Sequence, residues 1–171
     1  MVRNSCLNPI FTIFPEVYMS AKQPDMLAEI FRMQSLLNDY VFAKRDIRDG
    51  EGNTLTMQKL VELGESEAAK GPNTETNQWL ANYLSALDDE SRELREELLW
   101  KWWSEDSLDM QNIRVEIVDQ LHFWVSLALT SGMDAEKVYD LYLQKNQVNL
   151  ERQDQDYSKA TKDESDNLNI K

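Results

Sequence analysis

The chain has 171 residues, of which 18 are basic and 31 acidic, giving a formal net charge of −13. Such a charge repels nucleic-acid phosphates and anionic lipids, so a general nucleic-acid or membrane-surface binder is excluded. One cysteine and one histidine leave neither an intrachain disulfide nor the usual ligand set for a soft metal. The length suits one domain, or one subunit of an intertwined dimer, in a reducing cytoplasm.

The first 24 residues form a segment of their own. Its apolar stretches at 10–14 and 17–19 are interrupted by Pro9, Pro15 and Glu16, too early for a membrane span. No basic start leads into an unbroken apolar core, as a signal peptide requires. We predict an N-terminal arm over 1–24 that packs on a partner subunit; the alternative is an over-extended translation start.

Apolar spacing predicts the first helix over 25–43, capped by Asp25. Residues 46–53 hold two glycines and alternating charges, which predicts a loop. A short helix follows over 55–63 and is expected to end at Gly64.

The second half predicts three longer helices. After a break at 69–74, helical spacing runs over 75–103, followed by a turn at 104–109. A largely apolar helix is expected over 111–130 and a last one over 133–154.

No strand, Gly-rich phosphate loop or internal repeat stands out. The polar tail over 158–171 is expected to be disordered. The sequence therefore predicts an all-α helical bundle over 25–157.

Two pairs of carboxylates share one spacing, Glu90 with Glu93 and Glu116 with Asp119. An i, i+3 pair points to one side of a helix, so two facing helices would bring four carboxylates together. Four anionic groups repel one another unless cations lie between them. We therefore predict a four-carboxylate site for Mg²⁺, with Mn²⁺ as a substitute, between facing helices.

The second pair carries the stronger signal. Asp119 lies among Ile117, Val118 and Leu121, where a charged group is costly unless it is paired or binds a metal. The first pair lies in the acid-rich segment 87–99, for which a solvated helix face is the ordinary alternative. Both pairs together favour the metal site.

The pairs and their surroundings resemble the all-α nucleotide pyrophosphohydrolases, which include MazG-like enzymes and dimeric dUTPases, and are closest to the compact phage-type dCTPase/dUTPase. The resemblance spans about 26–158 and is carried by the E-x-x-E and E-x-x-D pairs, the Trp-rich segment 100–103 and the segment 112–123. It implies Mg²⁺-dependent hydrolysis of dUTP, with dCTP a further candidate, to the monophosphate and pyrophosphate. It also implies a homodimer or higher homo-oligomer in the cytoplasm, that of the host if the protein is viral.

The resemblance also implies which side chains act. Metals would be held by Glu90, Glu93, Glu116 and Asp119, and either Glu90 or Glu93 would orient or deprotonate the attacking water. In the family's first helix a Gln and an Asn contact the pyrimidine, and the matching residues here are Gln34 and Asn38. A buried amide can satisfy the donor and acceptor edge of a base. The alternative is two polar residues on an exposed face.

The closing helix carries a second candidate stripe. Lys145, Asn149 and Arg152 fall at i, i+4 and i+7 and share a face that suits a triphosphate. The alternative is a helix end whose basic residues favour the negative end of the dipole. The family's run often ends Asn-Gly-Tyr, whereas this chain has Gln155, Asp156 and Tyr157, with Tyr157 the matching substrate contact.

Three further residues carry side chains that could act in a site. Trp103 is a candidate substrate contact, or part of the core or a dimer interface. His122 is more often a hydrogen-bonded core residue than a general base. Ser126 has no partner base in the sequence, which does not support a serine nucleophile.

Two other functions stay open. A MazG-like enzyme on the same scaffold would prefer a purine triphosphate such as dGTP. Outside enzymes, the chain could be a helical dimerisation or interaction module whose acids form a solvated surface.

Overall fold

The computed structural model describes residues 25–66, 71–154 and 170, and this part of the chain is all-helical. Its helices, in chain order, are α3 (Met26–Lys44), α4 (Met57–Glu65), α5 (Glu75–Glu96), α6 (Met110–Thr130) and α7 (Ala135–Asp154). The described residues contain no strand, only an isolated bridge between Arg48 and Thr54 in the loop after α3. The predicted all-α class is confirmed. The N-terminal arm and all of the polar tail except residue 170 lie outside the described residues.

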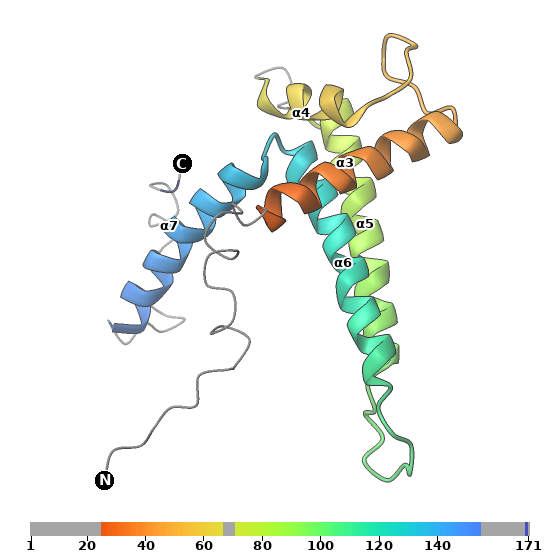
Figure 1. The fold of residues 1–171 in the computed structure, drawn as a ribbon, viewed down its shortest axis with the longest axis vertical. Helices are drawn as coiled ribbons and strands as arrows, with labels where there is room; N and C mark the ends of the chain where they lie inside the picture. The colour runs from red at the N-terminus through yellow and green to blue at the C-terminus, as the bar shows by residue number, and fades with distance from the viewer. Residues whose placement is uncertain (1–24, 67–70, 155–169, 171) are drawn as a thin grey trace, which may run out of the picture.

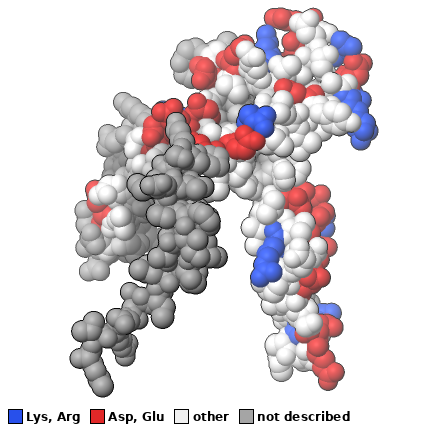
Figure 2. All heavy atoms as spheres, in the orientation of Figure 1, with Lys and Arg blue, Asp and Glu red and all other residues white. Residues whose placement is uncertain are grey.

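The long antiparallel pair α5 and α6 is the scaffold (Figure 1). At one end of this pair α3 crosses α6, α4 packs beside them, and α7 leads away to the side. Acidic side chains gather along the α5 side of the pair (Figure 2). Among the described helices none has both the length and the apolar character needed to cross a membrane.

The core lies where α3, α4, α5 and α6 meet. Its fully buried members include Phe42 of α3, Leu55 just before α4, Met57 and Leu60 of α4 and Val125 of α6. Burying an apolar side chain of this size contributes about 1.5–3 kcal/mol. The core therefore holds α3 and α4 against one end of the α5–α6 pair.

Polar residues cap the helices as their sequence positions suggest. Asp25 accepts a hydrogen bond from the Ala28 amide at 3.0 Å, which confirms it as the cap of α3. Thr56, Thr74 and Asp109 cap α4, α5 and α6 in the same way. Each such cap is worth about 1 kcal/mol.

The predicted helix over 75–103 is too long, because α5 ends at Glu96. Its end carries Glu93, Glu96 and Glu97, which lie unfavourably at the negative end of the helix dipole. Residues 97–109 instead form the connection at the far tip of the α5–α6 pair (Figure 1). The tryptophans of this segment pack edge to face on one another, with ring centroids 5.5 and 5.9 Å apart.

Gly64 does not end the short helix, because α4 continues to Glu65. The structure gives this glycine another role. A Cβ at this position would collide with the carbonyl oxygen of Thr130 and with the backbone of Ser131 and Gly132. Gly64 thus allows the end of α4 to approach the end of α6 closely.

Candidate active site

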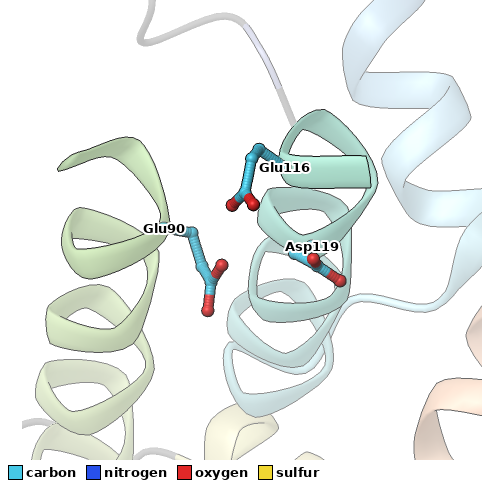
Figure 3. Close-up of side chains that lie close together, drawn as sticks. All are labelled: Glu90, Glu116 and Asp119. Carbon is cyan, nitrogen blue, oxygen red and sulfur yellow. The ribbon is translucent and has the colours of Figure 1, made fainter. Parts of the chain in front are cut away.

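Three carboxylates from neighbouring helices meet at one point. Glu90 lies on α5, Glu116 and Asp119 lie on α6, and one oxygen of each lies within 4.8 Å of the others. Figure 3 shows Glu90 and Glu116 extending toward one another from the two helices. All three are partly buried.

The electrostatics of this cluster disfavour its charged form. Burial raises the pKa of Glu90, and the negative charges of Glu93, Asp119 and Glu116 raise it further. Burial also raises the pKa of Glu116, together with the charges of Glu93, Asp119 and Glu97. A bound cation would favour the charged carboxylates and so lower the pKa of both Glu90 and Glu116.

One oxygen of Glu116 is buried and unpaired. Among the described residues, its Oε2 atom has no hydrogen-bond partner. Buried polar atoms in folded proteins nearly always have one. Oxygen donors from three carboxylates match the ligand preference of a hard divalent cation, so the residues present fit a metal of that class.

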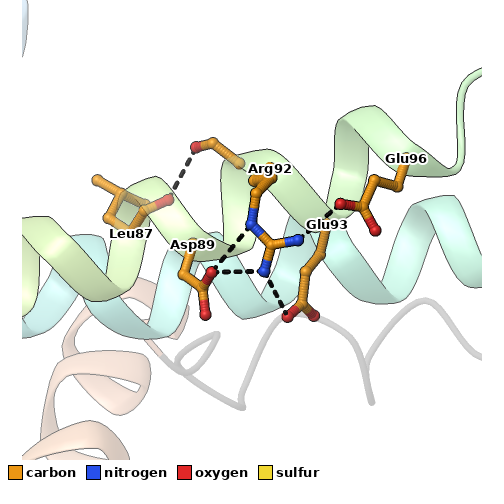
Figure 4. A network of polar contacts seen from close by, with 6 residues as sticks. Leu87, Asp89, Arg92, Glu93 and Glu96 are labelled. Atoms are coloured by element: carbon orange, nitrogen blue, oxygen red, sulfur yellow. Dashed lines mark hydrogen bonds and ion pairs between the residues drawn. The ribbon is translucent and has the colours of Figure 1, made fainter.

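Glu93 lies at the edge of the cluster. Its charge acts on Glu90 and Glu116, but it does not belong to the group of three. Its Oε1 lies 3.8 Å from Nη2 of Arg92, whose guanidinium also bonds Asp89 and Glu96 (Figure 4). The structure thus brings three of the four predicted ligands together and leaves the fourth beside an arginine.

A cavity of about 520 Å³ lies next to the carboxylates. Its wall includes Glu90 and Asp119 as well as the predicted base-contacting residues Gln34 and Asn38. Small-molecule sites typically have such volumes, with apolar walls and a few converging polar groups. The remaining lining residues are Leu37, Val41, Phe42, Ile47, Trp79, Tyr83, His122 and Phe123.

Gln34 and Asn38 are buried, only 6 % and 7 % exposed. Gln34 Nε2 donates to Asn38 Oδ1 at 3.0 Å and to Ser126 Oγ at 3.1 Å. Asn38 Nδ2 donates to Ser126 Oγ at 2.9 Å and to the sulfur of Met57 at 3.3 Å. Nδ1 of His122 lies 2.6 Å from Gln34 Oε1. The two amides therefore belong to a buried network and not to an exposed helix face.

The sequence did not predict that aromatic side chains, Trp79 and Tyr83 among them, line this cavity. Trp79 packs on Phe42 and Tyr83, with ring centroids 4.9 and 5.5 Å apart. Burial and the charge of Asp39 raise the pKa of Tyr83. Trp79, Tyr83 and Glu90 follow one another at intervals of four and seven residues, which puts them on one helix face. This shared helix face with Glu90 is the sequence signal that could have identified Trp79 and Tyr83 as site residues.

Other predicted substrate contacts lie away from this cavity. Trp103 is 61 % exposed on the connection between α5 and α6. Lys145 lines a different depression, with Leu27, Trp124 and Tyr142. Asn149 and Arg152 lie further along α7, and neither lines the cavity. Tyr157 lies outside the described residues.

The hydroxyl of Ser126 is fully engaged, because Oγ accepts from both amides and donates to the carbonyl oxygen of His122 at 2.9 Å. Within the described part of the chain, its three hydrogen-bond partners are thus two amides and a backbone carbonyl. The ring of His122 takes part in the network through Gln34.

Comparison with known proteins gives a family and individual relatives. A family model described as dUTPase matches residues 26–137. The dCTP pyrophosphatase of Enterobacteria phage LZ5 is 32 % identical over 104 residues, covering 46 % of this chain and 60 % of that protein. The dCTP pyrophosphatase of Enterobacteria phage T4 is 33 % identical over 104 residues, covering 46 % of this chain and 61 % of that protein.

The aligned part thus spans about three fifths of these relatives. No solved structure matches the chain significantly. The family match includes both carboxylate pairs, Gln34 and Asn38, and it covers more than half of the sequence. It confirms the resemblance to the phage-type dCTPase/dUTPase group, and the chain belongs to the dUTPase family that this model describes.

Proposed function

We propose that the protein is a metal-dependent pyrophosphohydrolase that converts dUTP and dCTP to the monophosphate and pyrophosphate. One observation carries the proposal. A single cavity is lined by two carboxylates of the acidic cluster, Glu90 and Asp119, and by the two amides Gln34 and Asn38. Family membership and the names of the phage relatives support the same reaction.

The acidic end of the cavity would carry the chemistry. Glu90, Glu116 and Asp119 would hold Mg²⁺, joined by Glu93, with Mn²⁺ as a substitute. When bound, the metal supplies Lewis-acid activation of phosphate oxygens and of a water molecule. One carboxylate of the first pair, Glu93 or Glu90, would orient the water and accept its proton; that Glu93 lies outside the group of three supports giving it this role. The water oxygen then bonds to the α-phosphorus as the bond to the bridging oxygen of pyrophosphate breaks.

The other end of the cavity would bind the base. Gln34 and Asn38 offer hydrogen-bonding groups there, and Trp79, Tyr83 and Phe123 form an apolar wall. A site that hydrogen-bonds the edge of a base discriminates strongly against bases that leave its polar groups unpaired. This division of the cavity supports a nucleotide whose base and phosphates are bound by different sets of side chains.

A second copy of the chain would complete the assembly. A mainly apolar groove of about 530 Å³ runs between α3 and α6, lined among others by Ile30, Met33 and Val118. These side chains are between 40 % and 54 % exposed, and contiguous apolar surface of this kind marks interaction sites. In a dimer or higher homo-oligomer, the triphosphate would be contacted by residues of a second copy, namely Lys145, Asn149, Arg152, Tyr157 and Trp103. The assembly would act in the cytoplasm, that of the host if the protein is viral.

The test is pyrophosphate release from dUTP, dCTP, dTTP, dATP, dGTP and the ribonucleotides, each with Mg²⁺, Mn²⁺ or EDTA. Selective cleavage of dUTP or dCTP that EDTA abolishes is the expected result. Preference for dGTP would keep the metal site and assign the MazG-like purine reaction instead. Absence of cleavage would favour the non-enzymatic interaction module.

A further inference from the structure

Ser126 lies at the centre of the buried network that joins α3 to α6. It is fully buried, with 0 % exposure. A hydroxyl has one hydrogen and two lone pairs. Its hydrogen is donated to the carbonyl oxygen of His122, so both lone pairs remain for the amides of Gln34 and Asn38.

This arrangement has a fixed polarity. A backbone carbonyl can only accept, so Ser126 cannot turn its hydrogen toward either amide without losing that bond. Each amide must therefore present its N–H₂ group, not its oxygen, to Ser126. The two ends of an amide have nearly the same size, so packing alone would not select between them. The helix carbonyl of His122 thus determines, through Ser126, which way Gln34 and Asn38 face.

The hydrogens of both amides are used inside the network. Those of Gln34 go to Asn38 and Ser126, and those of Asn38 go to Ser126 and to the sulfur of Met57. Gln34 Oε1 pairs with His122 Nδ1, which must carry the proton because an amide oxygen only accepts. Each amide oxygen keeps one lone pair. Gln34 and Asn38 can therefore accept hydrogen bonds from a bound base through their side-chain oxygens, but they have no amide hydrogen left to donate.

We propose that Ser126 is a positioning residue for base recognition, which keeps the cavity selective for a base that offers an N–H donor on its edge. Uracil offers its ring N3–H and cytosine its exocyclic amino group. The inference rests on the proposed function, because it takes the base to lie against Gln34 and Asn38 in the cavity that they line with Glu90. It adds a residue that does not line the cavity but acts through those that do.

The first test uses the single histidine of the chain. At alkaline pH, nitrogen NMR of the metal-free wild type should show a neutral imidazole protonated at Nδ1, because Gln34 Oε1 requires that proton. Ser126→Ala should shift the imidazole toward protonation at Nε2 as the amides lose their orientation. Ser126→Thr, which keeps the hydroxyl, should retain the wild-type signature.

Thr130 supplies the matched control. It is also fully buried, one helical turn later, and donates its hydroxyl to the backbone carbonyl oxygen of Ser126 at 2.8 Å, whereas the hydrogen bonds of both amides among the described residues go to other groups. Thr130→Val removes that hydroxyl and should leave the histidine signal unchanged. The proposal that Ser126 orients the two amides would be refuted by an unchanged histidine tautomer in folded Ser126→Ala. It would also be refuted if Thr130→Val gave the same change of tautomer.

The second test compares kcat/KM for dUTP and its N3-methylated analogue, which lacks the ring N–H. The wild type and Thr130→Val should reject the analogue by about tenfold or more, and Ser126→Ala should lower this ratio at least about threefold. An active enzyme whose ratio is the same in Ser126→Ala overturns this inference alone. A wild type that cleaves no nucleotide overturns the proposed function and the base-reading role with it.

Discussion

The acidic cluster should make the stability of the protein depend on a divalent metal, and Glu90→Gln should remove much of that dependence. Three carboxylates have oxygens within 4.8 Å of one another. This separation is shorter than the Debye length of about 8 Å at physiological salt, so added salt screens their repulsion poorly. A bound cation replaces repulsion by attraction, and it binds the folded chain because unfolding separates α5 from α6.

The size of the effect follows from binding linkage. Mg²⁺ at 100 times its dissociation constant stabilises a one-site protein by about 2.7 kcal/mol. For a chain of this length each kcal/mol raises Tm by about 2–4 °C. The wild type should therefore melt roughly 5–10 °C higher in Mg²⁺ than in EDTA.

Glu90→Gln should reverse the order of stability between the two conditions. In EDTA the variant should melt above the wild type, because burial and neighbouring charges disfavour the charged form of Glu90 and raise its pKa. In Mg²⁺ it should melt below the wild type, because it lacks one ligand. Calorimetry of both proteins in both buffers gives the four melting temperatures.

Asp88→Asn is the matched control, because it removes one charge from an exposed acid of α5 that lies outside the cluster. It should keep the full Mg²⁺ effect. A wild type that gains nothing from Mg²⁺ would refute the metal site. An equal gain in wild type and Glu90→Gln would refute the role of Glu90.

Further measurements test other parts of the structure. The folded-state pKa values of Glu90 and Glu116 are raised above 4.5, so the folded state holds these protons to higher pH than the unfolded chain. Their contribution to stability in EDTA should therefore fall as pH rises from about 4.5 through the raised values, and a Tm series in wild type and Glu90→Gln should show a weaker fall in the variant. Asp119→Ala should lower pyrophosphate release at least about 100-fold without loss of helical circular dichroism, and substantial retained activity would contradict its role. Gly64→Ala should destabilise the fold by about 1–3 kcal/mol in urea titration, because the new Cβ meets the backbone at the end of α6; an unchanged midpoint would mean that the helices separate at little cost. Ile30→Glu should shift sedimentation toward monomer, because it places a charge in the apolar groove; an unchanged oligomer would place the interface elsewhere.

Local sequence patterns predicted the helices well and their ends less well. Capping and apolar spacing placed α3 and α6 to within one residue, because these signals are local. The end of α5 was missed because helical spacing continues past Glu96. The excess of acids at that end was the competing signal.

The site shows the same division between local and tertiary information. Matched spacing found the carboxylates of α5 and α6, since facing pairs on adjacent helices need only a shared register. It could not find that Glu93 lies beside Arg92 and outside the group of three. Nor could it find that Ser126 holds Gln34 and Asn38, since these bonds join residues 88 and 92 positions apart.

The register of α5 connects the two ends of the candidate site. Tyr83 and Glu90 are separated by seven residues, which is about 10.5 Å along a helix that rises 1.5 Å per residue. Because seven residues complete nearly two turns, both side chains line the same cavity. A nucleotide whose base lies against Tyr83 and Trp79 would therefore extend its phosphates along α5 toward Glu90. In the proposed site one helix would thus set the distance between base and metal, and an insertion of a single residue between Tyr83 and Glu90 would turn the carboxylate about 100° away from the cavity.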